Sequence, residues 1–339
     1  MTTNSTETQL PNSSSVDVEK KEGINWLPDL KTHSRPLLSI CIPTFNRAIY
    51  LEHLLLNLLG EIGLLSDTIE IVVSDNCSTD NTQDVVNGFQ AKGLHIKYVK
   101  NYRNVGLDLN LRSAVVASSG IHCWLMGDDD AMRKGAVSFM AEHLRIHNPD
   151  IAISNRYLCD AELNVVSMDP LMLDTRPTVL FDCNEKSNLL DYFKKCQTTI
   201  GMFNFISTII IRKSCWMQAP EIPGMAKSIF PHVYKIMHIL RNQGGRLLYV
   251  NEPTVYARNN PRLQEVHGGS EFQDWQLHFY GNIEVADHFF SDDTDAYASF
   301  LNPVRRIIEH GKNHYLLLAQ KDGYINEAML TLKKLGIAI

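Results

Sequence analysis

Trp124-Leu125-Met126-Gly127-Asp128-Asp129-Asp130 is the segment of this 339-residue chain from which its architecture can be worked out. The apolar run 121–126 predicts a buried β-strand, and a glycine and three carboxylates follow it directly. Three adjacent like charges repel one another, so we expect a cation to compensate them. Carboxylate oxygens suit a hard cation such as Mg²⁺ or Mn²⁺, which commonly bridges protein carboxylates to substrate phosphates. A solvated acidic turn is the alternative, but a position at a strand's carboxyl end favours a ligand site.

Predicted strands and helices alternate around this segment. Apolar runs predict strands over 37–42, 70–74, 96–99, 121–126 and 151–154, and helical periodicity predicts helices over 50–59, 81–89, 107–117 and 134–147. Strands that alternate with helices require crossover connections, and these produce a mostly parallel sheet covered by helices on both faces. We therefore predict an α/β, doubly wound fold in which residues 36–155 form a nucleotide-binding half.

Polar residues follow four of the predicted strands at the points where those strands end. They are Pro43-Thr44-Phe45-Asn46-Arg47, Ser74-Asp75-Asn76-Cys77-Ser78-Thr79-Asp80, Asn101-Tyr102-Arg103-Asn104-Val105-Gly106 and the acidic triplet. Because the carboxyl ends of parallel strands meet at one edge of a sheet, the four loops should converge there. Each loop alone is typical of a turn with a helix cap, whereas the four together predict a binding site.

Composition restricts the class of protein. A net charge of −6 argues against a dedicated nucleic-acid binder, which would carry a basic balance. Seven cysteines without a Cys-x-x-Cys pair indicate reduced thiols and a cytoplasmic location. Residues 1–35 are polar and read as a disordered tail, and the sequence contains no apolar run long enough to span a membrane.

The residue patterns 40–47, 71–80, 104–106 and 127–130 together resemble the family 2 inverting glycosyltransferases of the GT-A fold. The Trp-Leu-Met-Gly-Asp-Asp-Asp form resembles an abequosyltransferase-like branch, which adds dideoxyhexoses or related sugars to bacterial surface polysaccharides. The resemblance covers residues 37–150. It implies sugar transfer from a nucleoside-diphosphate sugar to a saccharide or lipid-linked saccharide, as in O-antigen synthesis, with Mg²⁺ or Mn²⁺ as cofactor.

The resemblance also implies roles for individual residues. The nucleotide-sugar-binding residues would be Pro43, Thr44, Asn46, Arg47, Asp75, Asn104, Gly106 and Asp128. Among them, Asp75 would accept a hydrogen bond from the base and Arg47 would approach the phosphates. The metal ligands would be Asp129, Asp130 and His267, the last in a Gly-rich loop that could equally be a plain surface loop. The family usually has an aspartate where Gly127 stands, which leaves open which carboxylates touch the cation.

The second half is expected to bind the acceptor over residues 156–270, with a C-terminal helical segment over 271–339. The sequence predicts strands over 207–212, 246–250 and 254–258, and helices over 230–242, 272–290, 303–321 and 324–335. In the family a Glu-Asp pair usually opens the first of these helices and supplies the general base. His232 occupies that place and is the predicted base, because imidazole can accept a hydroxyl proton near neutral pH. A structural histidine is the alternative.

Two alternatives to a glycosyltransferase remain. A sugar nucleotidylyltransferase would share the substrate class, but its Gly-rich start is missing after the first strand. A catalytically idle sugar-nucleotide-binding protein would fit Gly127 and the missing Glu-Asp pair. The last predicted helical segment sets Lys333 and Lys334 beside Leu330, Leu332, Leu335 and Ile337, which suits contact with the cytoplasmic membrane face, packing on the chain's own core or a dimer contact.

Overall fold

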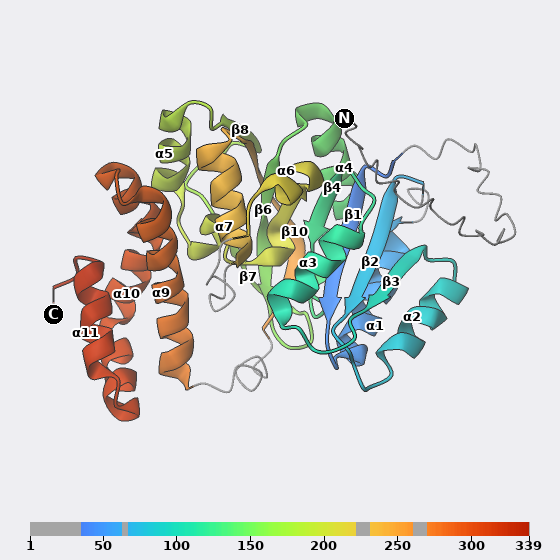
Figure 1. The fold of residues 1–339 in the computed structure, drawn as a ribbon, viewed down its shortest axis with the longest axis horizontal. Helices are drawn as coiled ribbons and strands as arrows, with labels where there is room; N and C mark the ends of the chain where they lie inside the picture. Colours follow the sequence, from blue (N-terminus) through green and yellow to red (C-terminus); the bar gives the residue numbers. More distant parts are fainter. Residues whose placement is uncertain (1–34, 63–66, 222–230, 260–269, 339) are drawn as a thin grey trace, which may run out of the picture. The chain divides into compact units, whose positions relative to one another are not determined.

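One mixed sheet of ten strands runs through residues 35–62, 67–221, 231–259 and 270–338, which are the residues that the computed structural model describes (Figure 1). Its strands are β1 (Leu38–Thr44), β2 (Ile69–Asp75), β3 (Ile96–Lys100), β4 (His122–Leu125), β5 (Ala131–Met132), β6 (Ile151–Cys159), β7 (Val165–Asp169), β8 (Thr178–Asp182), β9 (Ile209–Arg212) and β10 (Arg246–Arg258). The main order is β3-β2-β1-β4-β9-β6-β10-β5, with β7 beside β6 and β8 beside β10.

The sheet is mostly parallel, as predicted. Strands β1, β2, β3 and β4 pair in parallel, and so do β6 and β10. Strand β9 pairs antiparallel with both β4 and β6, so it is the reversed strand that joins the two parallel groups. Strand β6 continues past residue 155, where we placed the limit of the first half, so both halves contribute strands to the same sheet.

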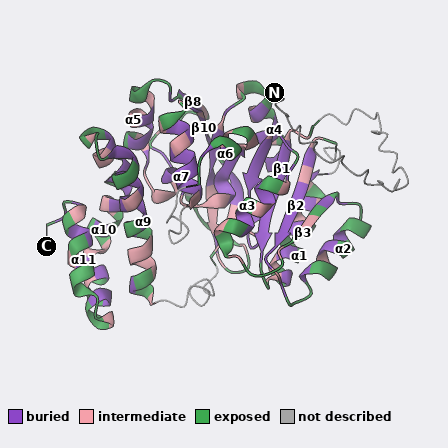
Figure 2. Cartoon of the chain, viewed as in Figure 1, coloured by how far each residue is buried: buried purple, intermediate pink, exposed green. Residues whose placement is uncertain are grey.

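Helices cover both faces of the sheet, because successive strand residues point to opposite sides. On one face Ile40 and Trp124 pack with α1 (Ala48–Ile62), α2 (Thr82–Ala91) and α4 (Ala136–His147). On the other face Cys41 and Leu125 pack with α3 (Leu107–Ala117), α5 (Lys186–Lys195), α6 (Lys213–Gln218) and α7 (Pro231–Met237). Figure 2 shows the buried strands between helices whose outer sides are exposed. The three-layer α/β architecture is therefore confirmed.

The C-terminal segment is helical, as predicted, and consists of α9 (Glu271–Phe290), α10 (Thr294–Asp322) and α11 (Ile325–Lys334). These helices extend the core of the α3 side and contact α5 and α7. In and after α11, Leu332, Leu335 and Ile337 are buried against that core, whereas Leu330 is exposed. Most of the apolar residues that suggested a membrane-facing helix therefore pack within the chain. None of the described helices combines the length and apolar character needed to cross a membrane.

Several boundaries differ from the predicted ones for identifiable reasons. Helix α10 begins nine residues before Pro303, which lies inside it. The two strands predicted over 246–258 are a single strand whose register shifts around Pro253, because a proline cannot donate to the ladder. The helix predicted over 230–242 is α7 followed by a π-helical turn at His238–Asn242. Short edge strands such as β5 and β7 were not predicted.

Candidate active site at the carboxyl edge of the sheet

The acidic triplet lies directly after β4 and is compensated by a side chain from the loop after β1. Arg47 Nη1 lies 3.1 Å from Asp128 Oδ1, and Arg47 Nη2 lies 2.5 Å from Asp129 Oδ2. Asp128 also accepts a 2.8 Å hydrogen bond from the hydroxyl of Thr44. The cation that we expected beside these carboxylates is therefore supplied in part by the chain itself, as the Arg47 guanidinium.

Asp130 is held by groups from the second half of the chain. Ser207 donates its hydroxyl to Asp130 Oδ2 at 2.5 Å, and the Arg258 backbone N–H donates to Oδ1 at 3.0 Å. Ser207 Oγ also accepts the backbone N–H of Gly127 at 2.9 Å. A Cβ at position 127 would lie 3.1 Å from an Asp130 oxygen and 3.3 Å from oxygens of Asp129 and Ser207. The glycine is thus explained by crowding, because any side chain there would press on the carboxylates.

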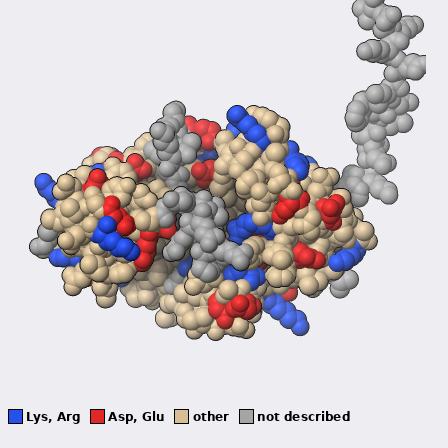
Figure 3. Space-filling model, turned by 90° about the horizontal axis from the view of Figure 1, so that it is seen from below, with Lys and Arg blue, Asp and Glu red and all other residues tan. Residues whose placement is uncertain are grey.

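Burial dominates the electrostatics of the triplet. It raises the pKa of Asp128 to about 7 and the pKa of Asp130 to about 7, and the neighbouring Asp129 adds to both shifts. Burial alone would lower the pKa of Arg47, but Asp128 and Asp129 outweigh this effect and raise it. Figure 3 views the face on which the strands end, and Lys and Arg side chains gather near its middle. This edge therefore combines buried carboxylates with cations, an arrangement suited to a substrate phosphate.

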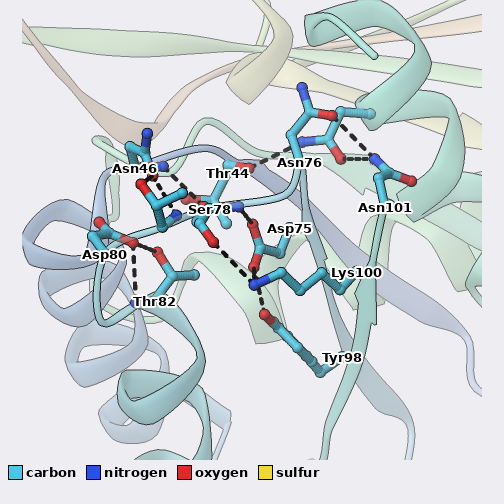
Figure 4. Close-up of polar contacts among 12 residues, drawn as sticks. Thr44, Asn46, Asp75, Asn76, Ser78, Asp80, Thr82, Tyr98, Lys100 and Asn101 are labelled. Carbon is cyan, nitrogen blue, oxygen red and sulfur yellow. Dashed lines mark hydrogen bonds and ion pairs between the residues drawn. The ribbon is translucent and has the colours of Figure 1, made fainter. Parts of the chain in front are cut away.

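Asp75 ends β2 and is fully buried (Figure 4). Its Oδ1 accepts the backbone N–H of Ser78 at 2.7 Å, and its Oδ2 accepts the hydroxyl of Tyr98 at 2.5 Å. Lys100 Nζ lies 3.5 Å from the same Oδ2. Burial and Asp75 together raise the pKa of Tyr98. The carboxylate predicted to accept a hydrogen bond from a base thus also holds β2, β3 and the second loop together.

The loops after β1 and β2 are bonded to each other through Asn46 (Figure 4). Its backbone N–H donates to Ser78 Oγ at 2.9 Å, and its Oδ1 accepts the backbone N–H of Thr79 at 2.8 Å. Asn46 has a φ of +52°, a left-handed conformation that asparagine tolerates better than most residues. Asp80 accepts backbone N–H groups of both Ala48 and Thr82, so one carboxylate caps two helices. This bonding keeps the exposed Asn46 side chain at the sheet edge.

The third loop is attached through Asn76, a residue that the sequence analysis did not single out (Figure 4). Asn76 Nδ2 donates to Asn104 Oδ1 at 2.8 Å and to the Gly106 carbonyl at 3.3 Å. Its Oδ1 accepts the backbone N–H of Val105 at 2.9 Å. Gly106 has a φ of +86°, which favours glycine. The predicted loop residues Asn104 and Gly106 are therefore brought to the same edge as Asp75, with Asn104 exposed.

The remaining predicted residues differ in accessibility. Pro43 and Thr44 are buried within β1, which extends to Thr44 instead of stopping at the proline. His232 is the second residue of α7, and its Nε2 lies 2.9 Å from the Phe203 carbonyl oxygen. Burial lowers the pKa of His232 to about 4, so the ring is neutral at neutral pH. His267 lies outside the described residues.

Two residues of the second half, Arg258 and Ser207, contact the triplet and were not predicted as site residues. For each, its position at the end of a predicted strand was a partial indication. Arg258 ends a predicted strand at the same edge as the four loops, and its Nε donates to the Asp129 carbonyl at 2.7 Å. Ser207 opens a predicted strand, but it reaches Asp130 only because β9 runs antiparallel to its neighbours. The direction of β9 was not predictable from its apolar pattern.

The protein side chains at this edge offer too few ligands to hold a metal ion without help from a substrate. No group of three or more His, Cys, Asp or Glu side chains in the described parts of the chain could hold one. Both oxygens of Asp130 already accept hydrogen bonds. Among contacts between described residues, Asp129 Oδ1 has no hydrogen-bond partner, and the Asp129 side chain is 12% exposed. Asp129 is therefore the best placed of the three to ligate a cation.

The sequence that forms this edge matches a known protein family. The family described as "Glycosyl transferase family 2" matches residues 39–214, about half of the chain. Abequosyltransferase RfbV of Salmonella typhimurium is 28% identical over 272 residues, which cover 78% of this chain and 79% of that relative. A second relative, the GalNAc(5)-diNAcBac-PP-undecaprenol beta-1,3-glucosyltransferase of Campylobacter jejuni, is 33% identical over 32% of this chain and 34% of its own.

Solved structures share the fold. The chain matches S. aureus TarS 1–349 in complex with UDP-GlcNAc with a TM-score of 0.63 at 17% identity, over 88% of this chain and 81% of that one. The Pyrobaculum calidifontis mannosyltransferase PcManGT, in complex with GDP-Man and Mn²⁺, matches with a TM-score of 0.50 at 14% identity, over 89% and 87%. With the family match spanning all four loops and the triplet, the chain belongs to glycosyl transferase family 2 and is a glycosyltransferase.

Proposed function

We propose that this glycosyltransferase transfers a hexosyl or dideoxyhexosyl group, with inversion, from a nucleoside-diphosphate sugar to a saccharide or lipid-linked saccharide during surface-polysaccharide synthesis. The observation that carries the proposal is the similarity to an abequosyltransferase over 78% of this chain, which includes the second half as well as the first. The family match alone ends at residue 214 and says less about the acceptor side.

The donor would lie across the edge where the four loops meet. Asn46 and Asn104 are exposed polar side chains on two of these loops, and Arg47 is 23% exposed beside the triplet. An arginine fork matches the geometry of phosphate oxygens and forms strong charge-assisted hydrogen bonds with them. We assign Asn46 and Asn104 to the nucleoside and Arg47 to the diphosphate. For Asp75 to bind the base, the base would have to replace one of its present donors.

A divalent cation fits this site if the substrate completes its coordination. Mg²⁺ and Mn²⁺ favour oxygen ligands, and Mg²⁺ is commonly bound by one or two carboxylates together with substrate phosphates. Asp129 would supply one protein ligand through Oδ1, and Asp128 is its neighbour. When bound, the cation would stabilise negative charge on the leaving diphosphate. His267 stays a predicted further ligand.

On the acceptor side, a base must take the proton of the attacking hydroxyl so that the anomeric carbon is attacked from the face opposite the diphosphate. His232 is the predicted base, and its ring is neutral at neutral pH. The name of the Campylobacter relative describes a lipid-linked acceptor. If the acceptor here is also lipid-linked, transfer takes place at the cytoplasmic face of the membrane.

A donor screen tests the proposal. Thermal unfolding is followed with UDP-, CDP-, GDP- and dTDP-sugars, with and without Mn²⁺, because a ligand that binds the native state raises apparent stability. We expect one nucleotide class to stabilise the protein, and more strongly with Mn²⁺. The stabilising donor is then assayed for sugar release or transfer. Binding without any turnover across candidate acceptors would instead identify a catalytically idle binding protein.

A further inference from the structure

Arg47 occupies a position that the cation would also need. Its guanidinium bridges two carboxylates, with Nη1 at 3.1 Å from Asp128 and Nη2 at 2.5 Å from Asp129. The guanidinium also lies 4.9 Å from the ring centroid of Tyr50, a cation–π contact. Both carboxylates are more buried than the arginine, whose side chain is 23% exposed. The Arg47 guanidinium thus covers the carboxylates on their more accessible side.

The three carboxylates differ in what else holds them. Asp128 has the Thr44 hydroxyl, and Asp130 has Ser207 and the Arg258 backbone N–H. Among the described residues, the Asp129 carboxylate has Arg47 as its partner. Withdrawal of Arg47 would therefore leave Asp128 and Asp130 in place and free the carboxylate of Asp129. An uncompensated buried carboxylate is unfavourable, so another cation would have to replace the guanidinium.

We propose that Arg47 takes the place of the divalent cation in the donor-free enzyme and moves from Asp129 to the diphosphate when the donor binds. The proposal rests on the donor and metal site proposed above. A guanidinium and a divalent cation cannot share the same oxygens, since their charges repel at contact distance. A diphosphate attracts the arginine through the same bidentate geometry that now engages two carboxylates.

This exchange gives Arg47 two effects of opposite sign. It competes with a metal ion for Asp129, so it weakens metal binding when no phosphate is present. It also contributes a cation to the diphosphate, so it strengthens phosphate binding. The metal and the donor would consequently enter together, because each removes an obstacle to the other. A residue that only stabilises the loop would weaken both kinds of binding when replaced.

The test measures the two ligands separately on Arg47→Met, which keeps an unbranched apolar stem and removes the charge. Mn²⁺ alone is titrated at about pH 8 and the free ion followed by electron paramagnetic resonance. Inorganic pyrophosphate is titrated by calorimetry in the presence of EDTA. We expect the variant to bind Mn²⁺ at least about tenfold more tightly than wild type, and pyrophosphate at least about tenfold more weakly.

Arg241→Met is the matched control. Arg241 is 22% exposed, pairs with Asp292 at 2.8 Å and lies over an aromatic ring, but it belongs to the π-helical turn after α7. Its replacement should change neither affinity. If Arg47→Met fails to fold, Arg47→Lys replaces it, because a point charge without the fork should show both shifts with smaller size.

Three results would overturn the proposal in distinguishable ways. Unchanged Mn²⁺ affinity in a folded Arg47 variant, with pyrophosphate binding weakened, would leave Arg47 as a phosphate ligand and refute the exchange. Failure of the wild-type protein to bind pyrophosphate, both in EDTA and together with Mn²⁺, would remove the donor site proposed above together with the exchange. Tighter Mn²⁺ binding with unchanged pyrophosphate binding would refute the movement to the diphosphate.

Discussion

Ser207→Ala removes one of the side chains that bond the acidic triplet to the second half of the chain. Ser207 is fully buried, donates to the Asp130 carboxylate at 2.5 Å and accepts the Gly127 backbone N–H at 2.9 Å. A hydrogen bond to a charged group contributes about 1.5–3 kcal/mol, and a buried donor left without a partner costs about 1–3 kcal/mol. We expect a loss of about 3 kcal/mol in the free energy of unfolding, a large share of a typical total of about 5–15 kcal/mol.

The substitution should also slow the enzyme. Without Ser207, the Gly127 peptide and the Asp130 carboxylate can both shift, and small displacements of a catalytic group are expensive. We expect a fall of about tenfold or more in kcat for donor turnover. Urea denaturation at about pH 8, above the raised pKa of Asp130, measures the stability, and steady-state turnover of the donor found in the screen measures the rate.

Thr208→Val is the control for this prediction. Thr208 is the next residue, is equally buried and donates its hydroxyl to the Phe205 carbonyl at 2.9 Å, without contact to the triplet. It should lose about 1 kcal/mol and keep its activity. In an Asp130→Asn background, Ser207→Ala should cost measurably less, since the charged partner is gone. A Ser207→Ala variant that matches Thr208→Val in both measurements would refute the reasoning.

Three further predictions concern pH, the base of the nucleotide and the acceptor. Burial raises the pKa of Asp130 to about 7, so between about pH 4 and about pH 7 the folded chain holds a proton that the unfolded chain has released, and stability falls as the pH rises. Asp130→Asn has no carboxyl group to titrate at this position, so its free energy of unfolding relative to wild type should rise by up to about 1.4 kcal/mol per pH unit across that range. Parallel plots of the two free energies of unfolding against pH would contradict this. Asp75→Ala should weaken nucleotide binding, and it should also lower stability because three donors lose their acceptor. Tyr98→Phe should lower stability alone. If calorimetry shows an unchanged nucleotide affinity for Asp75→Ala, Asp75 serves the fold only. His232→Ala should cut transfer by about 10²–10⁴-fold with donor affinity unchanged. A near wild-type rate would move the search for the base to Glu221, an exposed carboxylate that pairs with Lys235 of α7 at 2.9 Å.

The first half of the fold was predictable because its strands are continuous apolar runs. Strands β1, β2, β3, β4 and β6 and the four helices between them appear where periodicity placed them, within a few residues. The parallel order then brought four loops to one edge, and the structure confirms that convergence through Asn46 and Asn76. Local pattern and topology therefore suffice where each strand is buried on both faces.

The second half was less predictable because its elements depend on distant partners. Strand β9 lies between β4 and β6 with reversed direction, which no local pattern reveals. Pro303 would normally begin a helix, yet α10 starts earlier because its first turns are packed, with Ala296 and Phe300 buried. Short edge strands such as β7 expose Val165 and Val166 and thus lack the alternation that marks a strand.

The site itself was predictable in its location and not in its electrostatics. The sequence identified the triplet, Arg47 and Asp75 as polar residues at strand ends. It did not reveal that Arg47 already pairs with Asp128 and Asp129, because that contact joins residues more than eighty positions apart. Nor did it explain Gly127, whose missing side chain matters only once Ser207 and Asp130 are seen beside it.

The most direct test of the account is donor turnover by wild type and by Asp129→Ala, each with Mn²⁺ and with excess EDTA. We predict that wild type releases or transfers the sugar with Mn²⁺ and stops in EDTA. Asp129→Ala, shown to be folded by its unfolding curve, should lose at least about tenfold in rate, equivalent to about 1.4 kcal/mol of transition-state stabilisation. Undiminished turnover in EDTA, together with a folded Asp129→Ala variant as fast as wild type, would contradict the assignment of this edge as the catalytic site.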